Sequence, residues 1–235
     1  MIFHGNADGE EDEAEELDYV IQAFDDSEIK LITSNLAYNE LVNNTFNIAV
    51  QLDFLTGLRI GELLGLKKKF VFSNMIKVRN TLKRIKVFDT PSTWHYQVKL
   101  IKPKFSSSIR DIYYANLFYK NIEKYFKEQE TKWKANGLKF SDDSLIFTTA
   151  SCQPIDRTNF TRAWKRFLKR INIEYKKFHS IRDTYATSLI RRGAKIMTVK
   201  ELLGHSSISV TEKYYLYVFP EDKSETAELL NDIVS

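Results

Sequence analysis

Four short clusters in the sequence combine residue types that can bind and transfer a phosphoryl group. The first, TGLRIGE, places Arg59 just after a glycine turn, at the start of a predicted short helix. The second, HSIR, carries His179 and Arg182 at an i, i+3 spacing that puts both on one face of a helical start. The third, LLGH, ends in His205. The fourth is a pair of adjacent tyrosines, nine and ten residues after that histidine. Guanidinium groups bind phosphate oxygens, imidazoles donate and accept protons, and a tyrosine hydroxyl can form a covalent ester.

Each cluster taken singly has a structural interpretation. A lone arginine beside a short helix is usually a surface ion pair, and a lone HxxR occurs by chance in many proteins. A glycine followed by a histidine can end a helix, and paired tyrosines more often pack than react. The four clusters are specific only together and in this order.

The order Arg, His-x-x-Arg, Leu-Gly-His, Tyr resembles the tyrosine recombinase family, also called phage integrases. The phrases TGLRIGELLGL, HSIRDTYATSLI and LLGHSSISVTEKYYLYVFPE look like the three signature boxes of that family, and the first arginine lies about 120 residues before the HxxR. The resemblance covers roughly residues 35–235. It implies site-specific DNA recombination, integration or excision, by transesterification through a covalent 3′-phosphotyrosine.

The resemblance also assigns roles that suit this chemistry. Attack on a DNA phosphodiester builds charge on the non-bridging oxygens, which Arg59 and Arg182 can clamp bidentately. Losing one donor from such a preorganised site costs ~100–1,000-fold in rate. His179 and His205 can donate hydrogen bonds to the same oxygens, and His179 can help to take the proton of the nucleophile.

No cofactor or metal is expected for this reaction. A tyrosine, with its ordinary pKa near ~10, is a fair leaving group in the reverse step, so the energy of the broken bond is kept in the intermediate. The sequence shows neither carboxylates spaced for two-metal chemistry nor a Walker A glycine loop.

Two tyrosines compete for the position of the nucleophile. The family shows both a nine-residue and a ten-residue spacing after the histidine, which fit Tyr214 and Tyr215 respectively. Many integrases of this branch read Thr-x-x-x-Tyr-x-His-Val-x-Pro. Here Thr211 precedes Tyr215 by four residues and Pro220 follows it by five, whereas Tyr217 replaces the usual second histidine. This register favours Tyr215.

The resemblance further implies a catalytic lysine on a β-hairpin, acting as general acid to the leaving 5′ oxygen. The stretch KPKFSSSIRDI resembles the family's Pro-Lys-Thr, short loop, Arg-x-Ile segment, and a gapless match gives Lys104. Lys102 is the alternative because it lies on the same face of an alternating strand. Phe105 stands where the family usually has threonine or glycine. The structural interpretation is a lysine that contacts a DNA phosphate or is merely solvated.

Two acidic residues stand beside the predicted arginines. Glu62 follows the first arginine by three residues and can orient it within the helix turn. Asp183 adjoins the second arginine and can do likewise, at a position where the family often has histidine. The basic residues within 67–69 and 83–86 are expected to face DNA phosphates or solvent.

Charge is distributed unevenly along the 235-residue chain. Residues 1–35 carry eleven acidic groups and one lysine, whereas residues 36–235 carry 34 lysines and arginines against 20 acidic residues. We expect residues 1–35 to be an acidic leader, either linker or disordered segment. Residues 36–235 are expected to form the tyrosine recombinase catalytic domain. Its basic balance suits a polyanionic partner such as double-stranded DNA.

Composition narrows the class of protein further. The single cysteine, Cys152, excludes an intrachain disulfide and a multi-cysteine zinc site. No stretch approaches the ~20 apolar residues of a membrane span. The N-terminus lacks the basic region and apolar run of a secretory signal. A cytoplasmic protein without a membrane partner is expected.

Hydrophobic periodicity predicts an α+β domain, mainly helical, with a small antiparallel sheet within residues 70–113. Gly57 suits the C-cap of the first helix, and Asp156 and Ser180 suit the N-caps of two later helices. The helices are expected at residues 36–56, 59–66, 115–135, 156–171, 180–192 and 221–233.

The resemblance implies attachment sites in double-stranded DNA as the partner, a tetramer assembled on that DNA, and a monomer in its absence. Within the same chemistry, a Xer-like or transposon resolvase is the alternative, and a type IB topoisomerase fits less well because the LLGH box looks like that of an integrase. A catalytically silent DNA-binding module of the same fold is an alternative from another class, which the complete residue set disfavours. A protein-interaction domain is disfavoured by the basic body.

Overall fold

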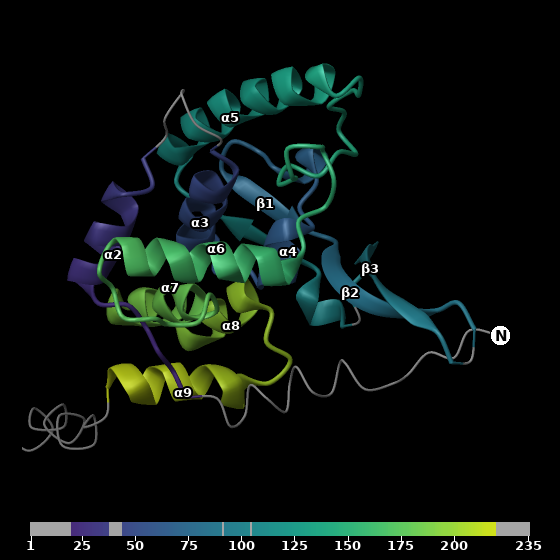
Figure 1. The fold of residues 1–235 in the computed structure, drawn as a ribbon. Helices are drawn as coiled ribbons and strands as arrows, with labels where there is room; N and C mark the ends of the chain where they lie inside the picture. The colour runs from purple at the N-terminus through teal and green to yellow at the C-terminus, as the bar shows by residue number, and fades with distance from the viewer. Residues whose placement is uncertain (1–19, 38–43, 91, 104, 220–235) are drawn as a thin grey trace, which may run out of the picture.

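The structure of the chain is a computed structural model that describes residues 20–37, 44–90, 92–103 and 105–219. Most of it is helical (Figure 1), as predicted for a mainly helical α+β domain. Within these ranges, no helix is long and apolar enough to cross a membrane. In chain order the helices are α2 (Asp26–Ser34), α3 (Thr45–Thr56), α4 (Ile60–Leu64), α5 (Asn116–Ala135), α6 (Arg157–Arg170), α7 (Ser180–Arg191), α8 (Ile196–Leu203) and α9 (Ile208–Val218), with 3-10 turns η1 (Lys68–Phe70) and η2 (Ser106–Ser108).

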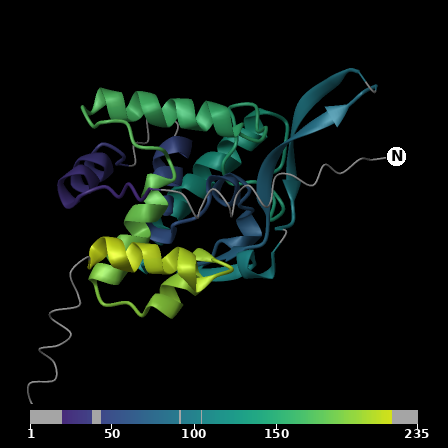
Figure 2. The same cartoon turned by 90° about the horizontal axis from the view of Figure 1, so that it is seen from below.

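The predicted antiparallel region consists of two separate two-stranded ladders, β1 with β4 and β2 with β3. In the first ladder, Ile76 pairs with Ile112 and both are fully buried. The second ladder is buried only near its base, at Leu82, while Phe88 and Trp94 at its far end are exposed. It therefore projects from the body as a hairpin (Figures 1 and 2). The strands are β1 (Met75–Val78), β2 (Thr81–Phe88), β3 (Trp94–Ile101) and β4 (Arg110–Tyr113).

Trp164 on α6 lies at the centre of the main apolar core. Its indole is fully buried and meets the rings of Phe24 and Phe178 edge-on, at 5.9 and 5.6 Å between centroids. Its Nε1–H donates to the carbonyl oxygen of Lys176 at 3.0 Å, so the polar atom of the ring is also satisfied. Helix α3 supplies a further part of this core, and α5 lies across it at the top of Figure 1.

A smaller core joins α7, α8 and α9. Its buried members come from all three helices: Tyr185, Ala186, Ile190, Val199, Leu203 and Tyr214. Figure 2 shows α9 beside α8 on the outside of the molecule. This packing holds the helix with the two tyrosines against the helix that carries the HxxR motif.

The first predicted helix is shorter than the periodicity suggested. It begins at Thr45, and residues 38–43 lie outside the described residues. It ends at Thr56, where Gly57 takes the left-handed conformation with φ +58° and donates its N–H to the carbonyl oxygen of Asp53 at 2.7 Å. The predicted glycine C-cap is confirmed.

Of the two predicted N-caps, one is confirmed and one is wrong. The side chain of Asp156 accepts from the backbone N–H groups of Thr158 and Asn159 at 2.8 and 3.3 Å. Ser180 is instead the first residue of α7, because His179 before it already has helical dihedral angles of −58° and −22°. The helix predicted at residues 221–233 lies outside the described residues.

Residues 20–35 differ from the leader that was predicted for residues 1–35. They include α2, whose N-cap Asp25 forms a capping box with Glu28. Phe24 and Ile32 are buried in the main core at 2% and 0% exposure. Acidic composition suggested a linker, but the apolar residues of this stretch are spaced to cover the core. Residues 1–19 lie outside the described residues.

Candidate active site

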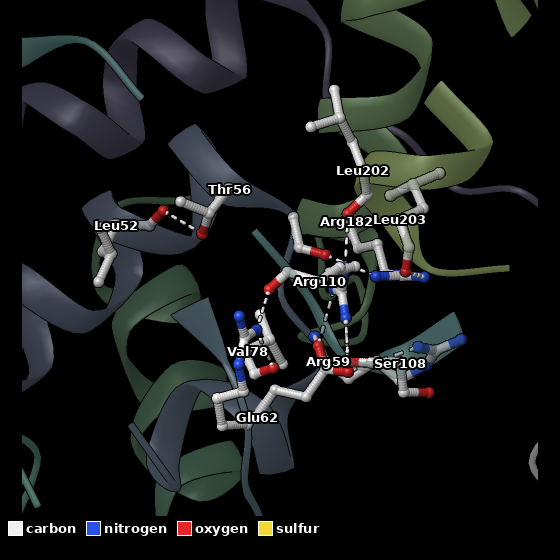
Figure 3. A network of polar contacts seen from close by, with 12 residues as sticks. Leu52, Thr56, Arg59, Glu62, Val78, Ser108, Arg110, Arg182, Leu202 and Leu203 are labelled. Carbon is white, nitrogen blue, oxygen red and sulfur yellow. Dashed lines mark hydrogen bonds and ion pairs between the residues drawn. The ribbon is translucent and has the colours of Figure 1, made fainter. Parts of the chain in front are cut away.

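Arg182, the second arginine of the predicted set, is fully buried in the first turn of α7. Its Nη1 donates to the carbonyl oxygen of Gly57 and its Nη2 to that of Leu203, both at 2.7 Å. The first carbonyl belongs to the turn that carries Arg59, and the second lies two residues before His205. One guanidinium therefore ties the three motifs together (Figure 3).

Glu62 holds the first arginine from within α4. Its Oε2 accepts from the backbone N–H of Arg59 at 3.0 Å, and its Oε1 lies 3.5 Å from Nη1 of the same residue. Arg110 donates to both carboxylate oxygens at 2.9 Å (Figure 3). Burial alone would raise the pKa of Glu62, but Arg110, with Arg59 and Arg182 nearby, lowers it to about 2. The ionised carboxylate thus orients Arg59, as expected.

Arg110 on β4 is a member of the site that sequence reasoning missed, having used it only to align the lysine segment. Its Nε donates to the carbonyl oxygen of Leu202 at 2.7 Å, so it joins β4 and α4 to the LLGH motif. Gly204 of that motif must stay small, because a Cβ there would lie 2.7 Å from the Ser107 carbonyl oxygen and 2.9 Å from Arg110 Cδ. A usable signal was the strand alternation that places Arg110 on the buried face of Ile112.

The two predicted histidines lie among these arginines. Burial, together with the positive charges of Arg182 and Arg59, lowers the pKa of His179 to about 3. Burial and the same two arginines also lower the pKa of His205 far below its ordinary value. The Nδ1 of His205 shares a hydrogen bond with Thr211 Oγ1 at 2.9 Å. Both imidazoles are therefore neutral near pH 7, each with one donor and one acceptor nitrogen.

The two tyrosines on α9 have different surroundings. Tyr214 is 5% exposed, its hydroxyl donates to Asp183 Oδ1 at 2.9 Å, and its ring stacks on His205 at 6.1 Å between centroids. Tyr215 is 37% exposed, and its ring tilts against Phe219 at 5.1 Å. Of these two tyrosines, Tyr215 therefore has the side chain that is more accessible from the surface.

Asp53 on α3 is a second neighbour of the site that sequence reasoning missed. It is 1% exposed, and this burial raises the pKa of its carboxyl well above the usual range, while the charge of Arg182 acts in the opposite direction. The signal available in the sequence was a single acidic residue within the apolar run TFNIAVQLDFLT. Arg182, which supplies that opposing charge, lies more than a hundred residues away along the chain.

The predicted lysines are placed only in part. Lys104 lies outside the described residues, and Lys102 is exposed just after β3. In the basic run before β1, Lys67 and Lys69 pair with the exposed carboxylate of Asp143 at 3.0 and 2.8 Å. Those two ammonium groups therefore face an acidic group of the protein's own surface, rather than solvent alone.

The projecting hairpin carries basic and aromatic side chains on one face. Arg84, Lys86 and Phe88 alternate along β2, and Trp94 and Tyr96 lie opposite them on β3. The guanidinium of Arg84 lies 3.9 Å from the centre of the Tyr96 ring, and the ammonium of Lys86 lies 4.2 Å from that of Trp94. Stacking on the rings keeps these cations on an exposed face, where a phosphate backbone can approach them.

Comparison with known proteins identifies the family. Residues 22–221 match the phage integrase family. The chain belongs to the phage integrase family. This integrase-family chain is 35% identical over 224 residues to a XerC-like tyrosine recombinase of Caldanaerobacter subterraneus subsp. tengcongensis, a match that covers 93% of the chain and 56% of the relative. It is 29% identical over 207 residues to the ICEBs1 integrase of Bacillus subtilis, a match that covers 88% of the chain and 53% of that integrase. It thus spans little more than half the length of these relatives.

Solved structures share the fold of this integrase-family chain. The Tn1549 transposon integrase in complex with circular intermediate DNA aligns with a TM-score of 0.68 at 22% identity, over 88% of the chain and 67% of that structure. XerA recombinase aligns with a TM-score of 0.62 at 20% identity, over 92% and 65%. The predicted fold, that of an integrase catalytic domain, is confirmed.

Proposed function

We propose that this member of the phage integrase family cleaves and rejoins double-stranded DNA at specific sites by transesterification. The hydroxyl oxygen of Tyr215 attacks the scissile phosphorus, the bond from phosphorus to the 5′ oxygen breaks, and a 3′-phosphotyrosine forms. The proton of the tyrosine passes to His179, and the 5′ oxygen takes a proton from Lys104. A 5′ hydroxyl from another strand then attacks the phosphotyrosine and gives its proton to Lys104. The bond from phosphorus to the tyrosine oxygen breaks, and that oxygen takes back the proton held by His179. A phosphodiester and the free tyrosine are restored, so no cofactor enters the reaction.

The observation that carries this proposal is the convergence of the three motifs on Arg182. Its two hydrogen bonds to carbonyls fix the turn of Arg59 and the loop of His205 around one buried guanidinium. Donors that are held in place before the reaction stabilise developing charge on phosphate oxygens without reorganisation. Surface arginines that merely pair with neighbours do not need such fixed, water-excluded surroundings.

The electrostatics of the site support the proposed role of His179. Its pKa of about 3 leaves the imidazole neutral, so one ring nitrogen can accept the proton of the attacking tyrosine. A bound phosphodiester brings a negative charge, which favours the imidazolium and raises this pKa toward the range of an effective base. His205, held by Thr211, donates to a phosphate oxygen instead.

The partner we propose is double-stranded DNA carrying attachment sites, bound in the cytoplasm by a tetramer that forms on two such sites. The basic balance of residues 36–235 and the exposed cations of the β2–β3 hairpin supply the attraction to phosphates. Mass photometry on a DNA fragment with two sites tests the assembly. Four chains per fragment are expected, and a single chain per site at saturation would contradict the tetramer.

Covalent capture tests the proposed reaction. The chain is incubated with a library of nicked duplexes whose arms are randomised, so that cleavage releases a short fragment and traps the protein on DNA. We expect an adduct that resists denaturant, is absent for Tyr215→Phe, and forms on a restricted set of arm sequences. Salt-sensitive binding to the same library without any adduct would overturn the proposal in favour of a catalytically silent DNA-binding module.

The role of Lys104 as general acid has its own test. A duplex whose scissile 5′ oxygen is replaced by sulfur has a leaving group of lower pKa, which departs without a proton. Lys104→Ala should lose capture on the oxygen duplex by at least ~100-fold, consistent with the ~100–10,000-fold worth of general acid catalysis, and recover it on the sulfur duplex. Lys102→Ala is the matched control and should behave as wild type. If Lys102→Ala instead loses capture on the oxygen duplex and recovers it on the sulfur duplex, the general acid is Lys102.

A further inference from the structure

Asp183 receives hydrogen bonds from two parts of the chain that are distant in sequence. It is fully buried in the first turn of α7, directly after Arg182. Its Oδ1 accepts from the hydroxyl of Tyr214 at 2.9 Å, and its Oδ2 accepts from the backbone N–H of Gln22 at 3.1 Å. Beyond its predicted role of orienting the adjacent arginine, these two bonds tie Asp183 to α9 and to the backbone of Gln22.

The segment of residues 20–24 has a second anchor beside the first. Thr184 Oγ1 accepts from the backbone N–H of Phe24 at 2.8 Å and donates to the carbonyl oxygen of Ser180 at 2.7 Å. Lys176 Nζ donates to the carbonyl oxygen of Ala23 at 3.1 Å. The backbone of this segment is therefore held against the start of α7, at the two residues that directly follow Arg182.

Tyr214 fixes how α9 is rotated about its own axis. The ring is held by stacking on His205, with 16° between the ring planes, and its hydroxyl is held by Asp183. Two points along one side chain define the direction in which that residue leaves the helix. Because successive residues of an α-helix differ by about 100° around the axis, the direction of Tyr215 follows from that of Tyr214.

We propose that Asp183 is a positioning residue that sets the placement of Tyr215 through Tyr214 and makes that placement depend on how residues 20–24 are held. This inference rests on the proposed function only in taking Tyr215 as the nucleophile. The segment, α7 and α9 then form one coupled unit around a shared carboxylate.

The coupling follows from the cost of leaving a buried carboxyl group without its hydrogen-bond donors. A carboxylate away from water must keep its donors, and losing one donor leaves the group to rotate or admit water. Withdrawal of the Gln22 N–H would therefore weaken the bond from Tyr214 on the other oxygen, and loss of the Tyr214 hydroxyl would weaken the bond from Gln22. Such coupling between two sites is reciprocal by thermodynamic necessity.

Hydrogen exchange on the full chain without DNA tests the coupling, independently of any activity. Tyr214→Phe, which keeps the ring on His205, should raise exchange of the amides in residues 22–24 at least threefold. Thr184→Val, which loosens the segment, should raise exchange in α9 by a similar factor. Tyr217→Phe, an exposed tyrosine on the same helix, is the control and should change neither. Changes confined to the neighbourhood of each substitution would overturn the proposal.

Capture kinetics on the nicked duplex library test the positioning role. Tyr214→Phe should lower the rate of adduct formation at saturating DNA about tenfold, with the DNA concentration for half-maximal rate unchanged. Asp183→Asn should retain most of the rate, since its amide oxygen can accept from Gln22 N–H while its NH₂ donates to Tyr214. Asp183→Ala should lose the rate. An equal loss of rate in Asp183→Asn and Asp183→Ala would contradict the positioning role of Asp183. A weaker affinity for DNA with an unchanged rate would contradict it as well. Absence of capture by the wild type would instead count against the proposed reaction and leave the exchange result standing.

Discussion

Arg182 and Arg59 share a proposed role but lie in different environments. Arg182 is fully buried, and both of its terminal nitrogens bind carbonyl oxygens. The Arg59 side chain is 27% exposed and pairs with Glu62. Glu62 also binds Arg110, so its carboxylate still has a cationic partner when Arg59 is replaced. The same change of arginine to alanine should therefore separate stability from chemistry at these two positions.

Arg182→Ala should lower the free energy of unfolding by ~3–5 kcal/mol, because it leaves buried carbonyl groups and nearby charges without the guanidinium that they contact. Arg59→Ala should lower it by about 1 kcal/mol or less, as for other partly exposed ion pairs. Both should lose DNA capture by ~100-fold or more. Urea denaturation and adduct yield measure the two effects. A similar loss of stability in the two variants would contradict the environments described here.

The two histidines of the site should make the protein sensitive to acid. The pKa of His179 is about 3 in the folded chain and near ~6.5 when unfolded. Between these values only the unfolded chain binds the proton, so this contribution to stability is complete above pH ~6.5 and is lost as the pH falls toward 3. The loss is ~1.4 kcal/mol per pH unit at most. In His179→Gln, the free energy of unfolding measured by urea denaturation should fall less steeply between pH 7 and pH 4 than in the wild type. An unchanged decline would show that His179 titrates normally.

At the scale of elements, glycine turns hold the motifs in contact. Gly57 has φ +58°, and a Cβ there would lie 2.5 Å from Cδ1 of Tyr185 on α7. The turn of α3 into α4 therefore packs directly on the helix of the HxxR motif. Gly193 has a similar left-handed conformation, at φ +80°, but its Cβ would meet nothing within 4 Å.

These two glycines give a matched comparison. Gly193→Ala should cost ~1–2 kcal/mol of unfolding free energy, the penalty for a left-handed alanine. Gly57→Ala should cost ~1–3 kcal/mol more, because the added methyl overpacks against the ring of Tyr185, and it should also reduce capture. Thermal or urea unfolding measures the difference. Equal costs would mean that the ring moves aside freely.

Elements whose signals are local could be predicted from the sequence, and those set by distant contacts could not. The cap at Gly57 and the cap at Asp156 depend on neighbouring residues, and both were predicted correctly. The start of α7 was misplaced by one residue because His179 is drawn into the helical turn. Local patterns could mark Arg110 and Asp53 as buried polar residues. Their roles, however, depend on partners that folding brings near, and a local pattern does not identify those partners.

At the scale of the whole molecule, positive charge is exposed on the β2–β3 hairpin, which projects from the rest of the protein. Arg84 and Lys86 lie on its exposed aromatic face, whereas Lys67 and Lys69 are engaged by Asp143. Net charge alone cannot distinguish these two pairs of cations. Their surroundings predict that the first pair contributes to DNA affinity and the second contributes little.

Replacing Arg84 and Lys86 together by glutamine should reduce the slope of log affinity against log salt by about 2, roughly 1 for each phosphate that the protein no longer neutralises. Replacing Lys67 and Lys69 by glutamine removes the same charge and should change the slope by much less. Fluorescence anisotropy with a labelled duplex at several salt concentrations measures both. Equal changes in slope would show that the hairpin has no particular part in binding.

The measurement that tests the central claim most directly is mass mapping of the captured adduct. After nuclease digestion, the peptide that spans α9 should carry a nucleotide on Tyr215, and Tyr214→Phe should leave that site of modification unchanged. An adduct on Tyr214 would overturn the assignment of the nucleophile and the positioning role of Asp183, while keeping the chemistry. An adduct on neither tyrosine would contradict the account of this chain as a phosphotyrosine-forming recombinase.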